Sequence, residues 1–428
     1  MRGRLGQRAV AAALVMAAVA VLAPPGAQAT ASSNTITGWV SALPGPTASA
    51  SPQDSAFSTV SGNGRYVVFL AQDSFSPLDT NGSDDIYVRD LLTDRVELIS
   101  VSADGKAAAG ARFSGGISDD GRYVAYASSA TNVVTPDANG AVEDIFVRDR
   151  TLGTTILASK NSSGTQLSTD VPAFFTMKIS GNGRYVVFNS KAPELLSPAS
   201  NILHIYVRDL QLGFTERVSV SSTSVLANNN SVNADISADG RWVAFATLAY
   251  NLGDDTNGTY RDVYVHDRTL HITSIASLTD GDAQVGSHDV DWPSISNDGQ
   301  KVAFISDGVM TPTGDTTAVT DVFVRNRATA STTKVSTRLG GGEADQDAGI
   351  PEISGDGTTV AWPSDSGEYI AGGGNGEYHM FKRVGAGPIT RESVSSTGVM
   401  GNASSYDPSL STDGTVLTYT SSATNLAT

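Results

Sequence analysis

The chain has 428 residues, a formal net charge of −16 at pH 7 and no cysteine. The lack of cysteine excludes disulfides and a lipid anchor on a processed cysteine, so stability must come from a buried core. The acidic charge argues against nucleic acid and anionic membranes as partners, and it favours cationic ligands, metal ions or basic proteins.

The N-terminus has the pattern of an export signal. Arg2, Arg4 and Arg8 precede an apolar run over residues 9–23, and residues 27–29 form a small-x-small cleavage site. The apolar run is shorter than the about 20 residues that span a membrane. We therefore predict a signal peptide that is cleaved after Ala29.

The sequence predicts that residues 1–29 take no part in the fold and that residues 30–428 form one domain. No later apolar run approaches the length of the first, so no membrane insertion is expected. The processed chain is expected to be secreted, soluble and monomeric. Its first strand-like segment covers residues 35–41.

One pattern, Ser-x-(Asp/Asn)-Gly-x-x-(Val/Leu)-x-aromatic, then recurs through the whole chain. Its copies begin at Ser61, Ser118, Ser180, Ser237, Ser296, Ser354 and Ser411, at spacings of 57 to 62 residues. Asp-Gly and Asn-Gly favour the positive φ of a tight hairpin turn, and the β-branched and aromatic residues that follow favour a strand. Each copy therefore predicts a β-hairpin.

A second motif of the type Ile-Tyr-Val-Arg-Asp follows each of the first five copies. It covers residues 86–90, 145–149, 205–209, 263–267 and 322–326, with a degenerate sixth copy at 380–384. A polar turn and a further strand pattern come next, so each repeat holds four short strands. Since helical periodicity is nearly absent, we predict an all-β fold: a seven-bladed β-propeller of four-stranded antiparallel blades.

The seventh repeat is incomplete. After residues 416–419 the chain gives only residues 421–426, which copy residues 128–133 of the second repeat, and then ends. The segment 35–41 has no first half of its own. We therefore expect the last blade to be a composite of N- and C-terminal strands, which would close the ring and cover exposed strand edges.

The paired motifs resemble the TolB-type propeller repeat, a relative of WD-type blades, and the resemblance covers essentially all of residues 30–428. It implies a propeller but no particular role, because this fold carries many functions. TolB itself has an additional N-terminal α/β domain, for which residues 30–55 are too short. No Gly-x-Ser-x-Gly motif of a serine peptidase occurs.

Binding residues are expected on the face that carries the long links between strands and between blades, around the central channel. Three of these loops share an Asp-x-Asn-Gly pattern followed by an aspartate. The predicted ligand set for Ca²⁺ is Asp79, Asn81, Asp85, Asp137, Asn139, Asp144, Asp255, Asn257 and Asp262. The alternative is that each loop forms an Asx turn, which bonds its own backbone.

Two further groups of residues invite a functional interpretation. The Arg-Asp pairs 89–90, 148–149 and 208–209 are interpreted as structural ties between neighbouring strands or blades. His204 and His379 take the place of the aspartate before the third strand, where they could approach a shared ligand. A catalytic metal centre would require several such ligands to converge.

The sequence thus favours a secreted, non-catalytic binding or scaffold protein whose long-loop face takes a protein or carbohydrate ligand. No catalytic residue is predicted, and no cofactor is required apart from the Ca²⁺ considered above. The alternative is a polysaccharide lyase or glycosidase, which needs paired carboxylates at the propeller mouth. Its candidate carboxylates are Asp289, Asp291, Glu343, Asp345 and Asp347.

Overall fold

The computed structural model describes most of the chain. The described residues are 16–21, 36–40, 55–108, 110–169, 177–195, 201–253, 255–258, 260–286, 288–311 and 319–427. Their regular structure consists of strands, apart from one 3₁₀ turn, η1, at Pro193–Leu195. The all-β prediction is confirmed.

Six blades are each built from four consecutive antiparallel strands. Blade 1 contains β3 (Ser55–Val60), β4 (Tyr66–Ala71), β5 (Asp85–Asp90) and β6 (Arg95–Leu98), and blade 2 contains β7 (Ala111–Ile117), β8 (Tyr123–Ser128), β9 (Asp144–Asp149) and β10 (Thr154–Leu157). Blade 3 contains β11 (Lys178–Ile179), β12 (Tyr185–Ser190), β13 (His204–Asp209) and β14 (Phe214–Arg217), and blade 4 contains β15 (Ser231–Ile236), β16 (Trp242–Thr247), β17 (Asp262–Asp267) and β18 (Ile272–Ile275). Blade 5 contains β19 (Val290–Ile295), β20 (Lys301–Ser306), β21 (Asp321–Asn326) and β22 (Ser331–Lys334), and blade 6 contains β23 (Glu352–Ile353), β24 (Thr359–Ser364), β25 (His379–Val384) and β26 (Ile389–Arg391).

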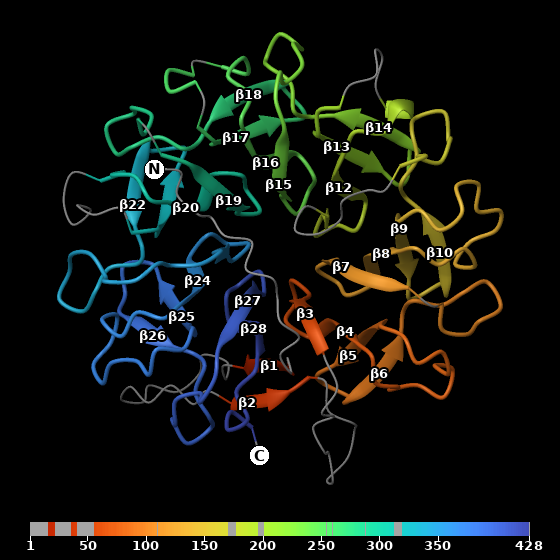
Figure 1. The fold of residues 1–428 in the computed structure, drawn as a ribbon, viewed down its shortest axis with the longest axis horizontal. Coiled ribbons are helices and arrows are strands. Elements are labelled where there is room, and N and C mark those ends of the chain that lie inside the picture. Colours follow the sequence, from red (N-terminus) through yellow and green to blue (C-terminus); the bar gives the residue numbers. More distant parts are fainter. Residues whose placement is uncertain are drawn as a thin grey trace.

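The blades follow one another around a ring, with the first strand of each nearest the centre (Figure 1). The last repeat contributes only two strands, β27 (Ser405–Leu410) and β28 (Val416–Ser421), so the repeats alone form six blades and not seven. These two strands lie in a composite sheet of order β2-β1-β28-β27, between blade 6 and blade 1.

The composite sheet differs from the prediction in one respect. Its third strand, β1, is Met16–Val21, which pairs with β28 from Met16 opposite Ser421 to Val21 opposite Val416. In the full chain, part of the segment predicted to be a signal thus pairs with the last repeat, while the division into a signal of residues 1–29 and a domain of residues 30–428 stays a prediction. A run of Met, Ala and Val can form a strand on the open edge of β28, and β2 (Ile36–Trp39) then pairs with β1. The arginines and the cleavage site of the predicted signal lie outside the described residues.

Every repeat serine organises its turn in the same way. In the first copy, Ser61 Oγ donates to Asn63 Oδ1 at 2.7 Å and accepts from the backbone N–H of Tyr66 at 3.0 Å, while the N–H of Gly64 donates to the carbonyl of Ser61 at 2.8 Å. The other six serines repeat these contacts and are buried. The motif is therefore a hydrogen-bonded hairpin turn, as its sequence predicts.

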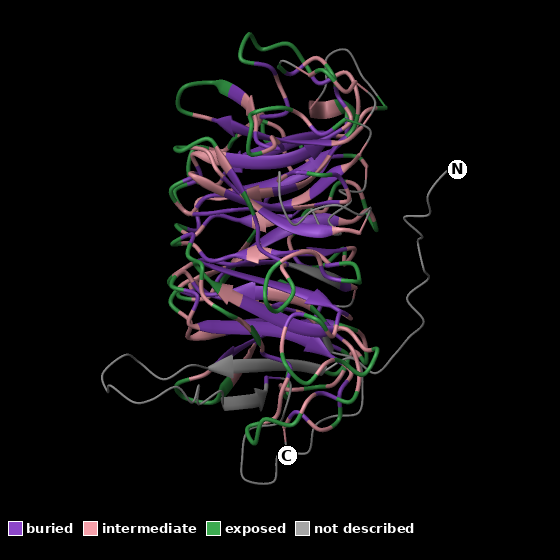
Figure 2. Cartoon of the chain, turned by 90° about the vertical axis from the view of Figure 1, so that its left-hand side faces the viewer, coloured by how far each residue is buried: buried purple, intermediate pink, exposed green. Residues whose placement is uncertain are grey.

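The core lies between neighbouring blades. Val187 and Ile205 of blade 3 pack with Ile236, Val243 and Phe245 of blade 4 in one buried cluster, and similar clusters join the other blades. The buried strands thus run through the thickness of the disc, as its edge-on view shows (Figure 2). Each sheet therefore buries its two faces against the sheets on either side.

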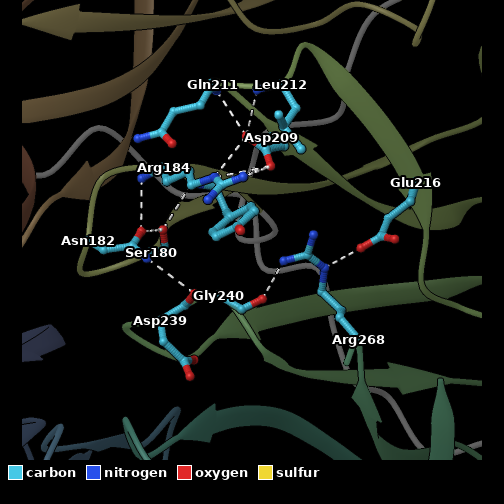
Figure 3. Close-up of polar contacts among 11 residues, drawn as sticks. Ser180, Asn182, Arg184, Asp209, Gln211, Leu212, Glu216, Asp239, Gly240 and Arg268 are labelled. Carbon is cyan, nitrogen blue, oxygen red and sulfur yellow. Dashed lines mark hydrogen bonds and ion pairs between the residues drawn. The ribbon is translucent and has the colours of Figure 1, made fainter. Parts of the chain in front are cut away.

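The aspartates of the Arg-Asp pairs do tie strands together. Each binds the arginine of the turn motif in its own blade and not the arginine beside it in the sequence. Asp209 accepts a forked pair of bonds from Arg184, the arginine of the turn motif, at 2.6 and 3.0 Å (Figure 3). Asp90, Asp149 and Asp267 are held in the same way by Arg65, Arg122 and Arg241. Such forked pairs fix the second strand to the third within blades 1 to 4.

No helix among the described residues is long and apolar enough to cross a membrane.

Candidate functional site

A cavity of about 120 Å³ lies at the centre of the ring, where the innermost strands of all the sheets converge. Its lining residues come just before the repeat serine of each inner strand. The cavity therefore lies toward the face on which the links between blades arrive, the face that the sequence favours for binding. Phe57, Met177, Trp292, Ile350 and Pro408 supply much of its apolar wall.

Four inner strands carry a bulge at the same position, four residues before the repeat serine. The bulged residues are Phe57, Asn233, Trp292 and Asp407, with φ of 53°, 52°, 55° and 54°. Each coincides with a register shift between the first and second strands of its sheet. A bulge re-aims a side chain, and all four residues line the cavity. Positive φ is costly for such residues, above all for Phe and Trp, and backbone strain of this kind concentrates at functional sites.

A charged layer forms the floor of this cavity. Lys178 Nζ lies 3.8 Å from Glu352 Oε2, and Asp235 contributes a second carboxylate beside the lysine. Ser294 Oγ donates to the same Glu352 oxygen at 3.3 Å and accepts the backbone N–H of Ile353 at 3.1 Å. This layer therefore links β11, β15, β19 and β23 across the channel.

The pKa values of the cavity carboxylates are set mainly by their burial. Burial raises the pKa of Glu352 to about 7, against the opposing effect of Lys178, and burial raises the pKa of Asp407 to about 6. The pKa of Lys178 is raised by Glu352, which stabilises its ammonium group. With three carboxylates and one ammonium group, the cavity is acidic at neutral pH and loses negative charge as the pH falls toward 5.

The channel continues beyond the charged layer. A second space of about 100 Å³ shares Lys178, Asp235 and Glu352 with the first and extends to the turn face. Asp119 and Asn297 line this end and lie against glycines of neighbouring turns: a methyl group on Gly62 would lie 2.1 Å from Asp119 Oδ1, and one on Gly355 would lie 2.5 Å from Asn297 Nδ2. Burial raises the pKa of Asp119 as well.

The nine residues predicted to bind Ca²⁺ are arranged as hydrogen-bonded turns. In blade 2, Gln166 Nε2 donates to Asp137 at 3.0 Å, Asn139 at 2.8 Å and Asp144 at 2.7 Å, which puts an amide where a cation would sit. In blade 4, Gln284 donates to Asp255 and Asp262, while Asn257 donates to a backbone carbonyl. In blade 1, the amide of Asn81 donates to Asp85 at 2.9 Å, and Asp79 accepts the hydroxyl of Tyr87.

The final aspartate of each loop bonds a serine of its own blade, and in two blades a histidine takes the place of this aspartate. Ser100 Oγ donates to Asp85 and accepts the backbone N–H of Ile86, and blades 2, 4 and 5 repeat this contact. His204 and His379 replace the aspartate and bond the equivalent serines, Ser219 and Ser393, at 3.2 and 3.0 Å. Burial lowers the pKa of both histidines to about 4, so they are neutral. They lie in blades 3 and 6 and bond within their own blades.

The acidic residues considered for catalysis bond to other parts of the chain. Asp291 pairs with Arg261 and accepts from Asn233, and Asp289 accepts the N–H of Arg261. Glu343 lies 3.9 Å from the buried Lys334, while Asp345 and Asp347 accept from Ser366 and the N–H of Thr320. None of the five lines the central cavity, and no group of three or more acidic, histidine or cysteine side chains in the described residues has metal-binding geometry.

The fold and this channel define the class of protein, a β-propeller with an acidic pocket at its centre. No protein-family model matches the chain, and no curated protein matches it. Among solved structures it is similar to an oligogalacturonate lyase in complex with manganese (12% identity, 86% of this chain and 89% of that chain, TM-score 0.50). It is equally similar to the propeller domain of the Trilobed protease from Pyrococcus furiosus (11% identity, 83% and 89%, TM-score 0.50).

The chain also resembles the putative TolB from Agrobacterium tumefaciens, at 14% identity over 96% of this chain and 99% of that chain, with a TM-score of 0.44. The propeller fold that the repeat predicts is confirmed by the ring of four-stranded antiparallel sheets in this structure. Identities this low identify the fold alone, so the function must be argued from the site.

Sequence reasoning missed the cavity residues, although a signal for them exists. The residue two places before each repeat serine is short in most copies, but it is Lys178, Asp235 and Glu352 in three of them. An alignment of the seven copies on their serines would have placed these three charges on one level of the channel.

Proposed function

We propose that this protein is an exported, non-catalytic binding protein that holds a cationic segment of a protein partner in its central cavity. The proposal rests on one observation: four bulged residues and three carboxylates from different blades face one pocket. The aromatic rings of Phe57 and Trp292 suit the apolar part of such a segment, and Asp407 and Glu352 suit an ammonium group.

The structure around the pocket supports binding rather than scaffolding alone. The bulges hold their side chains on rigid inner strands, so the pocket is formed before a ligand arrives. We further propose that the composite sheet acts as the seventh blade and keeps the pocket closed on that side, since Asp407 and Pro408 belong to β27.

A titration of a blocked pentalysine peptide tests the proposal, with tryptophan fluorescence as the readout, since Trp292 lines the cavity. We expect the double variant D407N/E352Q to weaken binding at least tenfold at pH 7.5. The matched control is E368Q, which removes an exposed carboxylate outside the cavity. Equal weakening by both variants would show that only the net charge of the chain attracts the peptide.

The predicted Ca²⁺ sites stay a proposal for the three Asp-x-Asn-Gly loops. Because side-chain amides already donate to the carboxylates, a cation must displace Gln166 or Gln284. Calorimetric titration with Ca²⁺ checks this: binding would give heat and a higher melting temperature, and neither is expected if the loops are Asx turns.

A polysaccharide-acting enzyme is the second candidate, and the raised pKa values of Asp407 and Glu352 favour it, since general acids work near their own pKa. Screening the purified protein against polysaccharides for released reducing or unsaturated ends tests this function. Turnover that D407N or E352Q abolishes would establish the enzyme, and binding without turnover would favour the first proposal.

A further inference from the structure

At three blade interfaces, an arginine of one blade lies over an aromatic ring of the preceding blade. The distances from guanidinium carbon to ring centroid are 4.6 Å for Arg150 over Tyr66, 4.4 Å for Arg268 over Tyr185 and 4.6 Å for Arg327 over Trp242. Each arginine comes directly after the third strand of its blade. The chain therefore contains three copies of one intramolecular arginine site.

These sites share two further contacts. The guanidinium donates to the carbonyl of the turn glycine in its own blade, which is Gly121, Gly240 or Gly299. In two sites it also pairs with a glutamate on the outer strand of the preceding blade, Glu97 or Glu216; Figure 3 shows the pair of Arg268 with Glu216. A ring face, a carbonyl and a carboxylate thus form the complete site.

The interface between blades 2 and 3 keeps part of this site but lacks the arginine. Leu210 stands at the arginine position, and Ile156 stands at the glutamate position and is 45% exposed. The ring of Tyr123 and the turn of Gly183 remain. Together with Val147, these residues line a groove of about 410 Å³, here called the blade 2–3 groove.

We propose that the blade 2–3 groove binds an arginine side chain of a partner protein, in the place that the chain's own arginines take at the other three interfaces. The guanidinium stacks on Tyr123 and donates to the carbonyl of Gly183, while exposed Ile156 packs against the aliphatic part of the side chain. This site lies on the turn face, outside the central cavity, and it does not depend on the function proposed for that cavity.

The charges around the groove are compatible with a bound arginine side chain. Arg122 and Arg184 also line it, but each is neutralised by a forked pair, with Asp149 and Asp209 respectively. The equivalent pairs, Arg184–Asp209 and Arg241–Asp267, flank the intramolecular site of Arg268. The net charge of −16 adds a long-range attraction for a basic partner.

The first test compares three blocked peptides, Gly-Arg-Gly, Gly-Lys-Gly and Gly-citrulline-Gly, by chemical-shift titration of the intact protein. We expect the arginine peptide to bind at least fivefold more tightly than the other two, because only arginine combines a charge with a planar fork. Equal affinity for arginine and citrulline would overturn the proposal.

Three variants locate the site. Ile156→Glu restores the missing carboxylate and should strengthen arginine binding about threefold, in line with the value of an exposed ion pair. Leu210→Arg should fill the groove from within, raise the melting temperature and abolish peptide binding. Leu212→Arg, which adds the same charge at a position that is 74% exposed, is the matched control and should leave binding unchanged.

Unchanged binding in Leu210→Arg, or equal loss in Leu212→Arg, would contradict the assignment to this groove. If Leu210→Arg fails to fold, the gain expected for Ile156→Glu still decides the matter, because a loss of stability cannot raise affinity.

Discussion

At the scale of single residues, the central cavity depends on side chains held in an unfavourable backbone conformation. Asp407 has φ of 54° and lies among apolar groups with Pro408 beside it. Aspartate and asparagine tolerate this region better than other non-glycine residues, whereas Phe57 and Trp292 do not. The strain at those two positions, together with a carboxylate held among apolar groups, costs stability and so supports the binding role proposed for the cavity.

The raised pKa of Asp407 makes a prediction about stability. Its folded pKa of about 6 lies above its ordinary value, so the ionised form destabilises the fold above pH 6, and this cost disappears as the pH falls toward 4. D407N, which keeps the shape and tolerates the same φ, should therefore raise the free energy of unfolding by about 1–3 kcal/mol at pH 7.5. Urea unfolding at pH 7.5 and pH 4 checks this, and an equal gain at both pH values would contradict it.

The turn glycines make a second prediction. Gly121 has φ of 78°, and a methyl group there would lie 2.0 Å from Tyr66 Cδ2 in the preceding blade. G121A should therefore destabilise the protein by about 2–4 kcal/mol, from backbone strain and from a disrupted interface. The control is G140A, at φ of 72° with no atom within 4 Å, which should cost only about 1 kcal/mol. Similar losses in the two variants would show that the aromatic contact contributes little.

At the scale of strands and blades, the arginines that cross between blades should stabilise the ring. Arg268 stacks on Tyr185, pairs with Glu216 and donates to the carbonyl of Gly240, and it is largely buried. R268L is expected to lower the free energy of unfolding by about 2 kcal/mol, because it leaves Glu216 and the carbonyl without their charged donor. The control R338L removes an exposed arginine that bonds only within its own turn, and chemical denaturation of both variants makes the comparison.

Most of the blade architecture could be predicted from the sequence, because the repeat encodes it locally. The Ser-Asx-Gly turn bonds to itself, as at Ser61, and the alternating apolar residues that follow need only a neighbouring sheet to bury them. The partner of each aspartate could not be predicted in this way, since Asp209 binds Arg184, 25 residues away, and not Arg208 beside it. The cavity residues could not be predicted from the repeat pattern, because the pattern contains only residues that the copies share and the cavity residues differ between copies.

At the scale of the whole molecule, the acidity of the central cavity predicts that binding depends on pH. Burial raises the pKa of Glu352 and of Asp407 above the ordinary values, so the cavity loses negative charge between pH 8 and pH 5. The affinity for a cationic peptide should therefore fall at least tenfold between pH 8 and pH 5. In D407N/E352Q the affinity for the peptide should change less with pH. If it changes as steeply as in the unmodified protein, other carboxylates cause the pH dependence.

Closure of the ring depends on the N-terminal segment and on the two strands of the last repeat. Val40 is 1% exposed in a core cluster with Val60 and Val67, and its carbonyl accepts from Arg89 at 2.9 Å, so the segment after β2 is anchored to blade 1. In the full chain, β1 separates β2 from β28. If the predicted signal is removed after Ala29, β1 is lost, and residues 35–41 are then the segment that can cover the edge of β28.

A chain of residues 30–428 should therefore melt well above a chain of residues 43–428. The shorter chain loses Val40 from the core and exposes the edge of β28, and we expect a fall of more than about 5 °C with an increased tendency to aggregate. A chain that begins at residue 36 is the control and should melt like the longer one, because it keeps β2 and Val40. Differential scanning calorimetry at several protein concentrations checks both effects. Equal melting temperatures for all three chains would mean that the two strands of the last repeat close the ring without the N-terminal segment.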